Sequence, residues 1–321
     1  MGPLAWVLGL SAVFFALFLV ISGAIYFSKG GAKGSSHSSG GAFLAAGKGS
    51  VGVIELNGVI MDSKKTLKKL EDYEESPGIK AVVLRLNSPG GAVAPSQEIY
   101  QAVKNYKKPL VVSMSSVAAS GAYYVAMGAK KVYANPGTIT GSIGVIMEFA
   151  NLEKLYEWAK VQRYAIKTGK FKDVGAEYRE MGPEERALLQ TMVDDVLSQF
   201  KQAVSDGRKL TMEQVTEVAD GRIFSGSQAK AAKLVDELGT LQDAVNEAGK
   251  LAGIEGKPDV VYPEKSRSRL MDLILDNGTG EDRSESSSSL VGALTSILNG
   301  HVEKAVTGLE PGIYWIWTGA R

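Results

Sequence analysis

The chain has 321 residues, 36 basic and 35 acidic side chains, no cysteine and only two histidines. Its length fits one α/β domain with attachments, and its 45% hydrophobic residues exclude a disordered chain. The net charge of +1 gives no reason to expect nucleic-acid binding, the missing cysteines exclude disulfides and thiolate chemistry, and two histidines leave little for a zinc site or a Ser-His-Asp triad.

The first predicted element is a membrane anchor at residues 4–27. These residues are nearly all apolar, and no charged side chain precedes Lys29. A helix of this length spans about 36 Å, enough to cross a hydrocarbon core of about 30 Å. The alternative is a cleaved signal peptide, which would have a basic start, a shorter apolar run and a small-residue cleavage site. The sequence therefore favours an uncleaved anchor.

A flexible linker is predicted for residues 28–50, which hold seven glycines and six serines. His37 lies in this linker, and a histidine on a mobile tether cannot be positioned for catalysis. Lys29, Lys33 and Lys48 follow the anchor, so the positive-inside rule read literally places the next domain in the cytoplasm. This charge bias is small and does not decide the orientation.

The body of the chain, residues 51–265, alternates strand patterns with helix patterns. Such alternation is typical of α/β proteins with a mostly parallel sheet. The expected strands are 51–56, 80–86, 110–114, 131–134 and 161–167. The expected helices are 64–75, 95–106, one opening near Ser120, one from Pro183 to about Asp206, 227–237 and 240–251. The longest helix carries an apolar stripe that we expect to be buried, formed by Leu188, Met192, Val196 and Phe200.

Residues 266–321 form a C-terminal tail of different composition. Residues 276–289 are polar and predicted to be mobile, and His301 lies in the same tail, which makes it a poor catalytic candidate. The tail closes with the run Gly-Ile-Tyr-Trp-Ile-Trp at 312–317. This run is either a final strand on the body or a contact between subunits, and the sequence does not choose between them.

Two glycine-marked turns follow strands of the body. The first, Asn87–Gly91, comes directly after the strand at 80–86. Its paired Gly90 and Gly91 let the backbone turn sharply and bring N–H groups close to a ligand. Such groups stabilise the oxyanion of acyl-transfer reactions. Taken alone, however, this turn is better explained as an ordinary connection from strand to helix.

The second turn, Ala118–Tyr124, places Ser120 among small residues at a predicted helix start. The helix dipole favours negative charge there, and the Gly121 N–H faces the same space. Taken alone, Ser120 is equally well explained as a helix cap. Because neighbouring parallel strands present such turns at one edge of the sheet, the two turns together indicate an oxyanion site.

A serine nucleophile needs a base, and neither histidine is well placed. A lysine base needs a pKa lowered from about 10.4 to about 7, which requires burial in an apolar pocket. The loop 167–173 offers Lys167, Lys170 and Lys172. Composition does not select among them, since most loop lysines are solvated.

Several separated blocks of the body resemble one family, signal peptide peptidase A in its short, single-domain bacterial form. The resemblance spans roughly residues 51–261, and its blocks are Asn87–Gly91, Ala118–Tyr124, Gly141–Gly144, Thr168–Asp173, Glu184–Arg186 and Ala219–Arg222. Ordered blocks are far more specific than any single one. The resemblance implies a membrane-anchored serine protease with a Ser–Lys dyad and an α/β fold of ββα repeats like those of crotonase and the Clp protease.

The resemblance also implies roles for individual residues. Ser120 matches the nucleophile and Lys172 the general base. Ser142 matches the position whose hydroxyl orients the lysine amine. Lys167 and Lys170 flank the motif position and are set aside on that ground.

The resemblance also implies which backbone N–H groups form the oxyanion hole. Gly91 and Gly121 match the oxyanion-hole donors of the family, and Gly90 matches the residue that shapes the turn. Two positions depart from the family pattern: Ala122 replaces a usual second glycine, and Lys233 stands where glycine is usual. Neither belongs to the dyad. No metal or organic cofactor is implied.

The family assembles into a ring or dome, which implies a homo-oligomer here. In the long forms the serine and the lysine lie in different tandem halves. This chain has one half, so the resemblance suggests that Ser120 and Lys172 meet across a protomer boundary. It further implies a single-pass protein of the bacterial plasma membrane, an extracytoplasmic catalytic domain, and cleaved signal peptides and similar apolar peptides as substrates.

Two alternatives remain at this stage. One is a crotonase-like acyl-CoA hydrolase or isomerase, which would use paired N–H donors on a thioester together with a catalytic glutamate and a CoA-binding surface. The other is a non-catalytic membrane scaffold of the same fold. A serine-directed probe would leave Ser120 of such a scaffold unlabelled.

Overall fold

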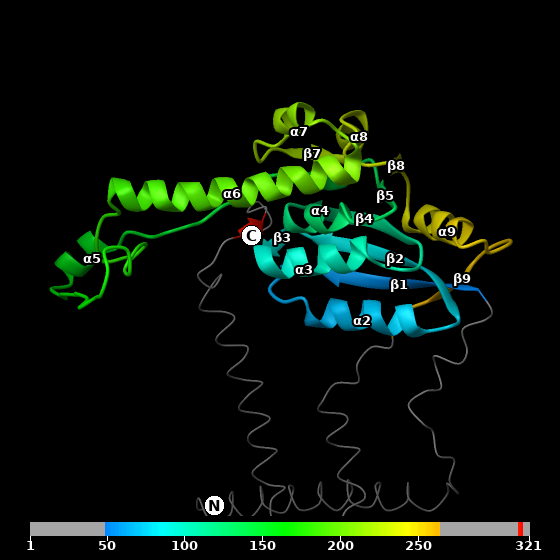
Figure 1. The fold of residues 1–321 in the computed structure, drawn as a ribbon, viewed down its shortest axis with the longest axis horizontal. Helices are drawn as coiled ribbons and strands as arrows, with labels where there is room; N and C mark the ends of the chain where they lie inside the picture. The colour runs from blue at the N-terminus through cyan, green and yellow to red at the C-terminus, as the bar shows by residue number, and fades with distance from the viewer. Residues whose placement is uncertain (1–48, 264–313, 317–321) are drawn as a thin grey trace, which may run out of the picture. The chain divides into compact units, whose positions relative to one another are not determined.

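A mostly parallel sheet organises the residues that the computed structural model describes, 49–263 and 314–316 (Figure 1). Its strands are β1 (Ser50–Asn57), β2 (Ile79–Ser88), β4 (Leu110–Ala119), β5 (Lys131–Ala134), β6 (Ile139–Gly141), β7 (Ile223–Ser225), β8 (Glu237–Leu238) and β9 (Asp259–Val261). The order along the sheet is β7-β6-β4-β2-β1-β9, with β5 beside β4 and β8 beside β5. Every neighbouring pair is parallel except β6 and β7. The predicted α/β class with a mostly parallel sheet is confirmed.

Helices connect the strands and cover the sheet. Their bounds are α2 (Lys64–Glu75), α3 (Val93–Lys104), α4 (Gly121–Ala126), α5 (Glu153–Trp158), α6 (Pro183–Arg208), α7 (Met212–Val218), α8 (Gly226–Ala231) and α9 (Leu241–Leu251). A second, smaller sheet pairs β3 (Gly90–Ala92) with β10 (Tyr314–Ile316) in antiparallel fashion.

The central strands are buried on both faces. Val83 and Val111 pack into a cluster with Val245 of α9, whereas their neighbours Leu84 and Val112 pack into the larger cluster on the other face. Side chains alternate between the two faces of a strand, so a strand covered on both sides needs an uninterrupted apolar sequence. This is why the runs at 80–86 and 110–114 predict their strands correctly.

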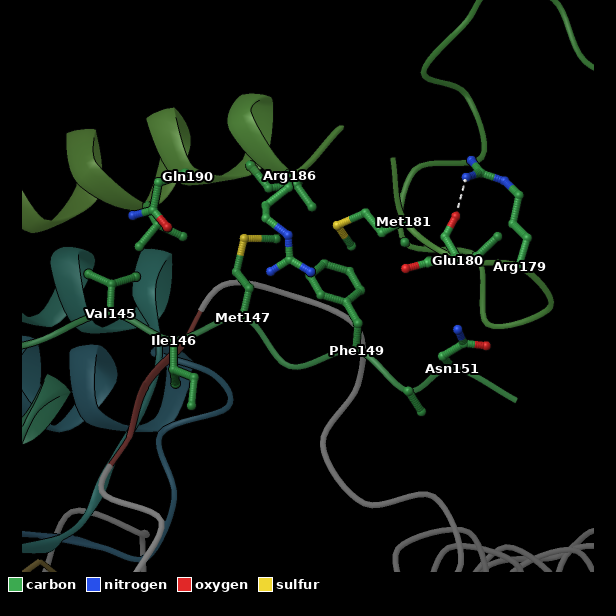
Figure 2. A pocket seen from close by; sticks show the side chains of 15 residues that line it. Val145, Ile146, Met147, Phe149, Asn151, Arg179, Glu180, Met181, Arg186 and Gln190 are labelled. Carbon is green, nitrogen blue, oxygen red and sulfur yellow. Dashed lines mark hydrogen bonds between the residues drawn. The ribbon is translucent and has the colours of Figure 1, made fainter. Parts of the chain in front are cut away.

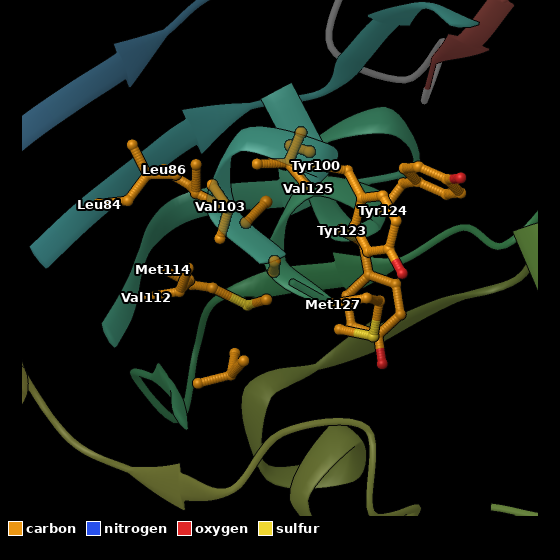
Figure 3. Close-up of a cluster of buried hydrophobic side chains, with 14 of the residues drawn as sticks. Leu84, Leu86, Tyr100, Val103, Val112, Met114, Tyr123, Tyr124, Val125 and Met127 are labelled. Atoms are coloured by element: carbon orange, nitrogen blue, oxygen red, sulfur yellow. The ribbon is translucent and has the colours of Figure 1, made fainter. Parts of the chain in front are cut away.

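Tyr124 of α4 packs between helices α3 and α6 in the larger cluster. Its ring centroid lies 4.8 Å from that of Tyr100 on α3 and 5.2 Å from that of Phe200 on α6. Figure 3 shows Tyr100 and Tyr124 beside Val103 and Val125 in this core. Because α4 is held between α3 and α6, the residue immediately before α4 has a fixed position.

The strand expected at 161–167 is wrong. The α5–α6 loop, residues 159–182, contains no strand or helix in the structure. Tyr164 is 84% exposed and Ile166 is 99% exposed, so the apolar pattern of this segment is not buried by the described part of the chain. A strand needs a neighbour for its backbone groups, and none lies beside this segment among the described residues.

The buried stripe expected on α6 is correct only in its second half. Val196 and Phe200 are buried, but Leu188 and Met192 are 44% and 40% exposed. The N-terminal half of α6 extends past the sheet towards α5 (Figure 1), so it has less surface to pack on. Leu189 is the buried apolar residue of that half.

The helix expected at 227–237 is shorter than predicted and ends at Ala231. The chain then turns through Lys233, whose φ is 59°, towards β8. Glycine adopts this left-handed conformation without strain, which explains why the family usually has glycine at the position that Lys233 occupies here. The short α7 was not expected.

Several predictions concern residues outside the described ranges. The anchor at 4–27, nearly all of the linker, both histidines and the polar stretch at 276–289 lie there. Within residues 49–263 and 314–316, no helix is long and apolar enough to span a membrane.

Candidate active site

Ser120 lies on a strained turn between β4 and α4. Its backbone angles are φ 54° and ψ −118°, a conformation that residues with a side chain rarely adopt. Ser120 is 1% exposed and occupies the N-cap position, but its hydroxyl does not cap the helix. It donates to none of the described residues. The capping alternative is therefore wrong, and strain at a residue with an unbonded hydroxyl points to a functional role.

Ser142 occupies the equivalent place at the end of the neighbouring strand. Ala119 of β4 pairs with Gly141 of β6, and each serine follows one member of this pair. The Ser120 N–H donates to the Gly141 carbonyl at 2.8 Å, and the Ser142 N–H donates to the Arg222 carbonyl at 2.9 Å. Ser142 also has a positive φ, 51°, and is buried. The two serines thus end adjacent strands at one edge of the sheet.

Gly90 and Gly91 lie at the same edge, because β2, which ends at Ser88, also pairs with β4. A Cβ on Gly91 would lie 2.1 Å from the Ile60 carbonyl oxygen, so only glycine fits. The Ile60 N–H donates to the Gly90 carbonyl at 2.9 Å, and the Ala92 N–H donates to the Ile60 carbonyl at 2.8 Å. Backbone groups alternate in direction along a strand, so the Gly91 N–H points away from Ile60.

Gly121 supplies a second backbone donor at this edge. It is the first residue of α4, and the first N–H groups of a helix have no acceptor within the helix. Its N–H donates to no acceptor in the described part of the chain, and α4 contacts β3. The predicted oxyanion donors, Gly91 and Gly121, are therefore on elements that touch each other beside Ser120.

The edge of β3 that carries the Gly91 N–H is covered by β10. The two strands are antiparallel, with the pairs Tyr314–Ala92, Trp315–Gly91 and Ile316–Gly90. Tyr314 also exchanges two backbone hydrogen bonds with Ile146, at 3.1 and 3.2 Å. A strand is thus held between β3 and the segment that follows Ser142. Of the two interpretations of the run at 312–317, the strand on the body is the one that its described residues, Tyr314–Ile316, adopt.

Lys172 lies far from this edge within one chain. It is in the α5–α6 loop, and its neighbour Lys170 is ion-paired with Glu184 in the first turn of α6. Helix α4 instead packs on Phe200, about 26 Å along α6 from Pro183 at 1.5 Å per residue. The structure gathers Ser120, Ser142, Gly90, Gly91 and Gly121 at the sheet edge, and it does not bring Lys172 to them.

Lys172 differs from the other two lysines of residues 167–173. Lys167 is ion-paired with Asp173, and Lys170 with Glu184. The exposed ammonium of Lys172 has neither a hydrogen bond nor an ion pair to any residue that the structure describes. Among the three lysines of residues 167–173, Lys172 is therefore the one that remains available to a group from outside the chain.

Arg179 fastens the α5–α6 loop to the start of α6. Its guanidinium donates to both oxygens of Asp173, at 2.8 and 3.2 Å, and to both oxygens of Glu185, at 2.5 and 2.8 Å. Glu185 also accepts from the Gly182 N–H at 2.8 Å. Because Asp173 directly follows Lys172, this network fixes the backbone from which Lys172 extends.

The sequence analysis missed this network. A glutamate three residues after Gly182, at the start of a long helix, is the capping pattern that could have located Glu185. Nothing in the sequence marks Arg179, whose partners are set by the course of the loop.

The network predicts how the loop responds to acid. Arg179 lowers the pKa of Glu185 to about 2, and with Lys167 it holds the pKa of Asp173 well below its usual range. A carboxyl group whose pKa is lowered by folding stabilises the folded loop at pH values above its unfolded pKa of about 4. This contribution is lost as the pH falls through the pKa of the folded state. We expect hydrogen-exchange protection of amides 172–176, corrected for intrinsic rates, to hold from pH 7 to about 4.5 and to fall between about 4 and 2.

Arg179→Gln should lose most of this protection already at pH 7, because two facing carboxylates then lack their shared cation. Arg186→Gln is the matched control, since Arg186 lies nearby on α6 and has no ion pair to a described residue. Unchanged protection in Arg179→Gln would contradict the assignment.

Two family models match the chain. The model of peptidase family S49 matches residues 102–255, and the Clp protease model matches residues 53–139. The first range contains Ser120, Ser142 and Lys172. The second contains most of β1, all of β2 and β4 and both glycine turns, and it agrees with the mostly parallel α/β sheet.

Named relatives are similar over about two thirds of the chain. "Putative protease slr0021" of Synechocystis sp. is 46% identical over 212 residues, which are 65% of this chain and 76% of that protein. "Serine protease SPPA, chloroplastic" of Arabidopsis thaliana is 34% identical over 67% of this chain and 32% of that protein. "Putative signal peptide peptidase SppA" of Enterococcus faecium is 34% identical over 61% of this chain and 62% of that protein.

Proposed function

The chain belongs to peptidase family S49, the family of signal peptide peptidase A, and we propose that it is a membrane-anchored endopeptidase with a Ser120–Lys172 dyad. It is a serine-type peptidase. Membership in a peptidase family removes the support for an acyl-CoA hydrolase or isomerase. The observation that carries the dyad proposal is the strained turn at Ser120, whose hydroxyl lies near the glycine turn of β3 and has no hydrogen bond to any residue that the structure describes.

The proposed reaction forms and then hydrolyses an acyl-enzyme. The Ser120 Oγ attacks the peptide carbonyl while the Lys172 Nζ takes the hydroxyl proton. The N–H groups of Gly91 and Gly121 stabilise the oxyanion, and loss of one such donor typically costs about 3 kcal/mol. Lys172 then gives the proton to the leaving amine, and water, activated by the same amine, releases the acyl group from Ser120. The Ser142 hydroxyl would orient the lysine amine.

A second copy of the chain is proposed to supply the lysine. The α5–α6 loop and the end of α5 expose apolar side chains: Trp158 is 80%, Tyr164 84% and Ile166 99% exposed. Exposed apolar side chains that lie close together mark contact surfaces, and packing of a neighbouring copy on this loop would bury them. It would also carry Lys172 to the neighbour's Ser120 and remove water from the amine, as a lysine base requires.

Apolar peptides, cleaved signal peptides among them, are the proposed substrates. The Enterococcus relative is named as a signal peptide peptidase. An extended peptide would bind the edge of β3 through its main chain, as β10 does, which suits substrates of varied sequence. An anchor at 4–27 would hold the protease at the bacterial plasma membrane. The family resemblance favours an extracytoplasmic catalytic domain over the orientation that the weak charge bias suggests.

A fluorophosphonate probe tests the nucleophile. We expect the detergent-extracted full chain to be labelled at Ser120, identified by peptide mass spectrometry, because an activated serine attacks the probe phosphorus. Ser120→Ala should carry no label, whereas Ser113→Ala, which removes a buried serine from the same strand, should label fully. Absence of label on folded wild-type protein would instead favour the scaffold alternative.

A further inference from the structure

The turn that leads into β7, residues 219–222, is one of the blocks that resemble the family, but it has no part in the proposed reaction. It lies beside the segment that follows β6, because β6 and β7 pair. The Ser142 N–H donates to the Arg222 carbonyl at 2.9 Å, and the Gly221 N–H donates to the Ile143 carbonyl at 3.1 Å. These two hydrogen bonds lie on either side of the Ser142 side chain along the backbone.

Asp220 fixes the conformation of this turn. Its carboxylate accepts from the Arg222 backbone N–H at 3.1 Å and from the Arg222 guanidinium at 2.5 to 2.9 Å. Gly221, between the two, has a φ of 86°, which glycine adopts without strain. The backbone and the side chain of Arg222 are thus both bound to Asp220. The carbonyl that accepts from the Ser142 N–H belongs to the same arginine.

This ion pair is too exposed to contribute much to the stability of the whole domain. The side chains of Asp220 and Arg222 are 51% and 58% exposed. Exposed ion pairs add little to the free energy of unfolding, because water and salt screen them. Arg222 lowers the pKa of Asp220 to about 2, so the carboxylate is charged at neutral pH. The effect of the pair is instead local, on the residues to which the turn is hydrogen-bonded.

The backbone conformation of Ser142 needs support from its surroundings. Its φ is 51°, and Gly141 before it also has a positive φ, 78°. A strained conformation persists only where the neighbouring structure fixes it. The Ser142 hydroxyl has no hydrogen bond to any residue that the structure describes, so no such bond fixes its direction. The direction of the hydroxyl therefore depends on how firmly the backbone is held.

The chain around β7 packs closely enough on the segment after β6 to position it. A Cβ on Gly141 would lie 2.6 Å from the Phe224 ring, and a Cβ on Gly144 would lie 3.2 Å from the Gly221 Cα. Neither position has room for a side chain unless its neighbour moves. A shift of the turn at 219–222 is therefore passed directly to the backbone on both sides of Ser142.

The residues after Gly144 have free space on one side. Figure 2 shows Val145, Ile146 and Met147 along one wall of a groove of about 560 Å³, with α6 opposite. Because this stretch borders open space, it restrains the preceding residues less than a packed segment would. The hydrogen bonds to the turn at 219–222 then have a larger share in holding Ser142 in place.

We propose that Asp220 and Arg222 are positioning residues that direct the Ser142 hydroxyl at the Lys172 amine of a neighbouring copy. The inference rests on the proposed function, in which Ser142 orients that lysine. The pair acts indirectly: it fixes the turn, the turn fixes the backbone of Ser142, and this backbone sets the direction of the hydroxyl. Proton transfer depends on such alignment, because a displacement of about 1 Å can lower a rate about 100-fold.

Asp220→Ala tests the kinetic effect in the assembled full-length protein. We expect kcat for peptide-ester hydrolysis to fall about 10-fold and KM to change less than about twofold, because the lysine is aligned for the reaction and not for substrate binding. Asp220→Asn, whose amide oxygen can still accept from the Arg222 N–H, should recover part of the loss. Arg222→Gln should behave like Asp220→Ala and repeats the test should that variant fail to fold.

Glu237→Ala is the matched control. It breaks a similarly exposed ion pair, that of Glu237 with Lys230, whose side chains are 49% and 40% exposed. Glu237 lies on β8, which pairs with β5 and not with β6. This variant should keep the wild-type kcat.

Hydrogen exchange at the Ser142 amide measures the structural step separately. That N–H donates to the Arg222 carbonyl, so Asp220→Ala should speed its exchange at least about 10-fold. Amides of β2 should keep their wild-type rates, which shows that the sheet is intact. On a Ser142→Ala background, Asp220→Ala should cause no further loss of kcat, because no hydroxyl is left to direct.

Several results would overturn the inference. Unchanged exchange at Ser142 in Asp220→Ala would do so, as would a wild-type kcat. An equal further loss on the Ser142→Ala background would show that the pair supports the whole edge of the sheet, and loss of assembly by sedimentation would identify it as a contact between copies. In each case, fluorophosphonate labelling of wild type at Ser120 leaves the proposed function intact. If wild type neither hydrolyses the ester nor takes the label, the proposed function fails as well.

Discussion

Replacing Ser120 by alanine should lower kcat/KM for peptide-ester hydrolysis by at least about 10⁴-fold, because no other group is placed to attack the carbonyl. Lys172→Ala should cause a loss of the same order, and the double variant should lose no more than either single variant. Groups that act as a unit show this non-additivity. Initial rates on the detergent-extracted full chain, with sedimentation to verify assembly, measure the effect.

The chain supplies a matched control for each substitution. The Ser113 hydroxyl on β4 is buried without a hydrogen-bond partner among the described residues, so Ser113→Ala leaves nothing unpaired and should retain activity. Lys170 lies two residues before Lys172 and pairs with Glu184, so Lys170→Ala should also remain active. Near-normal turnover in Ser120→Ala or Lys172→Ala, with assembly intact, would refute the dyad.

Mixing the two inactive variants should restore activity. When Ser120→Ala and Lys172→Ala chains are co-expressed in equal amounts, a site between neighbouring copies is complete if one copy supplies the serine and its neighbour supplies the lysine. Random assembly completes about a quarter of the sites, so we expect about 25% of wild-type activity. Each variant expressed alone should stay inactive. The measurement is the ester-hydrolysis rate of mixed assemblies purified through two different tags.

This complementation separates two arrangements of the dyad. If Ser120 and Lys172 of the same copy met, every mixed assembly would lack one partner at every site, and its rate would remain at the level of the single variants. Within one chain, Lys172 precedes the start of α6, whereas α4, which follows Ser120, packs on Phe200 in the second half of α6. This separation is why we expect restoration. A mixture of the double variant with wild type is the control, because it contains chains that supply neither residue.

The sheet, and the edge of it that gathers Ser120 and the two glycine turns, could be predicted because local pattern and topology agree there. The runs at 80–86 and 110–114 form strands that are buried on both faces, so their nearly continuous apolar sequence predicts a strand. The helix expected at 64–75 has the bounds of α2, since Pro77 and Gly78 stop it. Turns after neighbouring parallel strands meet at one edge, which places Ser120 near Gly91 without any knowledge of side-chain contacts.

The α5–α6 loop could not be predicted from the same signals. Tyr164 and Ile166 lie in an apolar segment that has the composition of a strand, yet both are almost fully exposed. An apolar pattern indicates a preference for burial but does not specify what covers the residues. The same ambiguity misplaced Leu188 and Met192 on α6. The pairing of β10 with β3 joins residues about 220 positions apart, and no local signal in the sequence encodes it.

The strand β10 has a kinetic consequence for any peptide that uses the edge of β3. A main-chain edge accepts one strand at a time, so such a peptide binds only after β10 has left. A competitor within the same molecule is not diluted with the protein, and its effective concentration is set by the connecting chain. For substrates that bind this edge as proposed, β10 would raise the apparent KM by one common factor and leave kcat unchanged, as a tethered competitive inhibitor does.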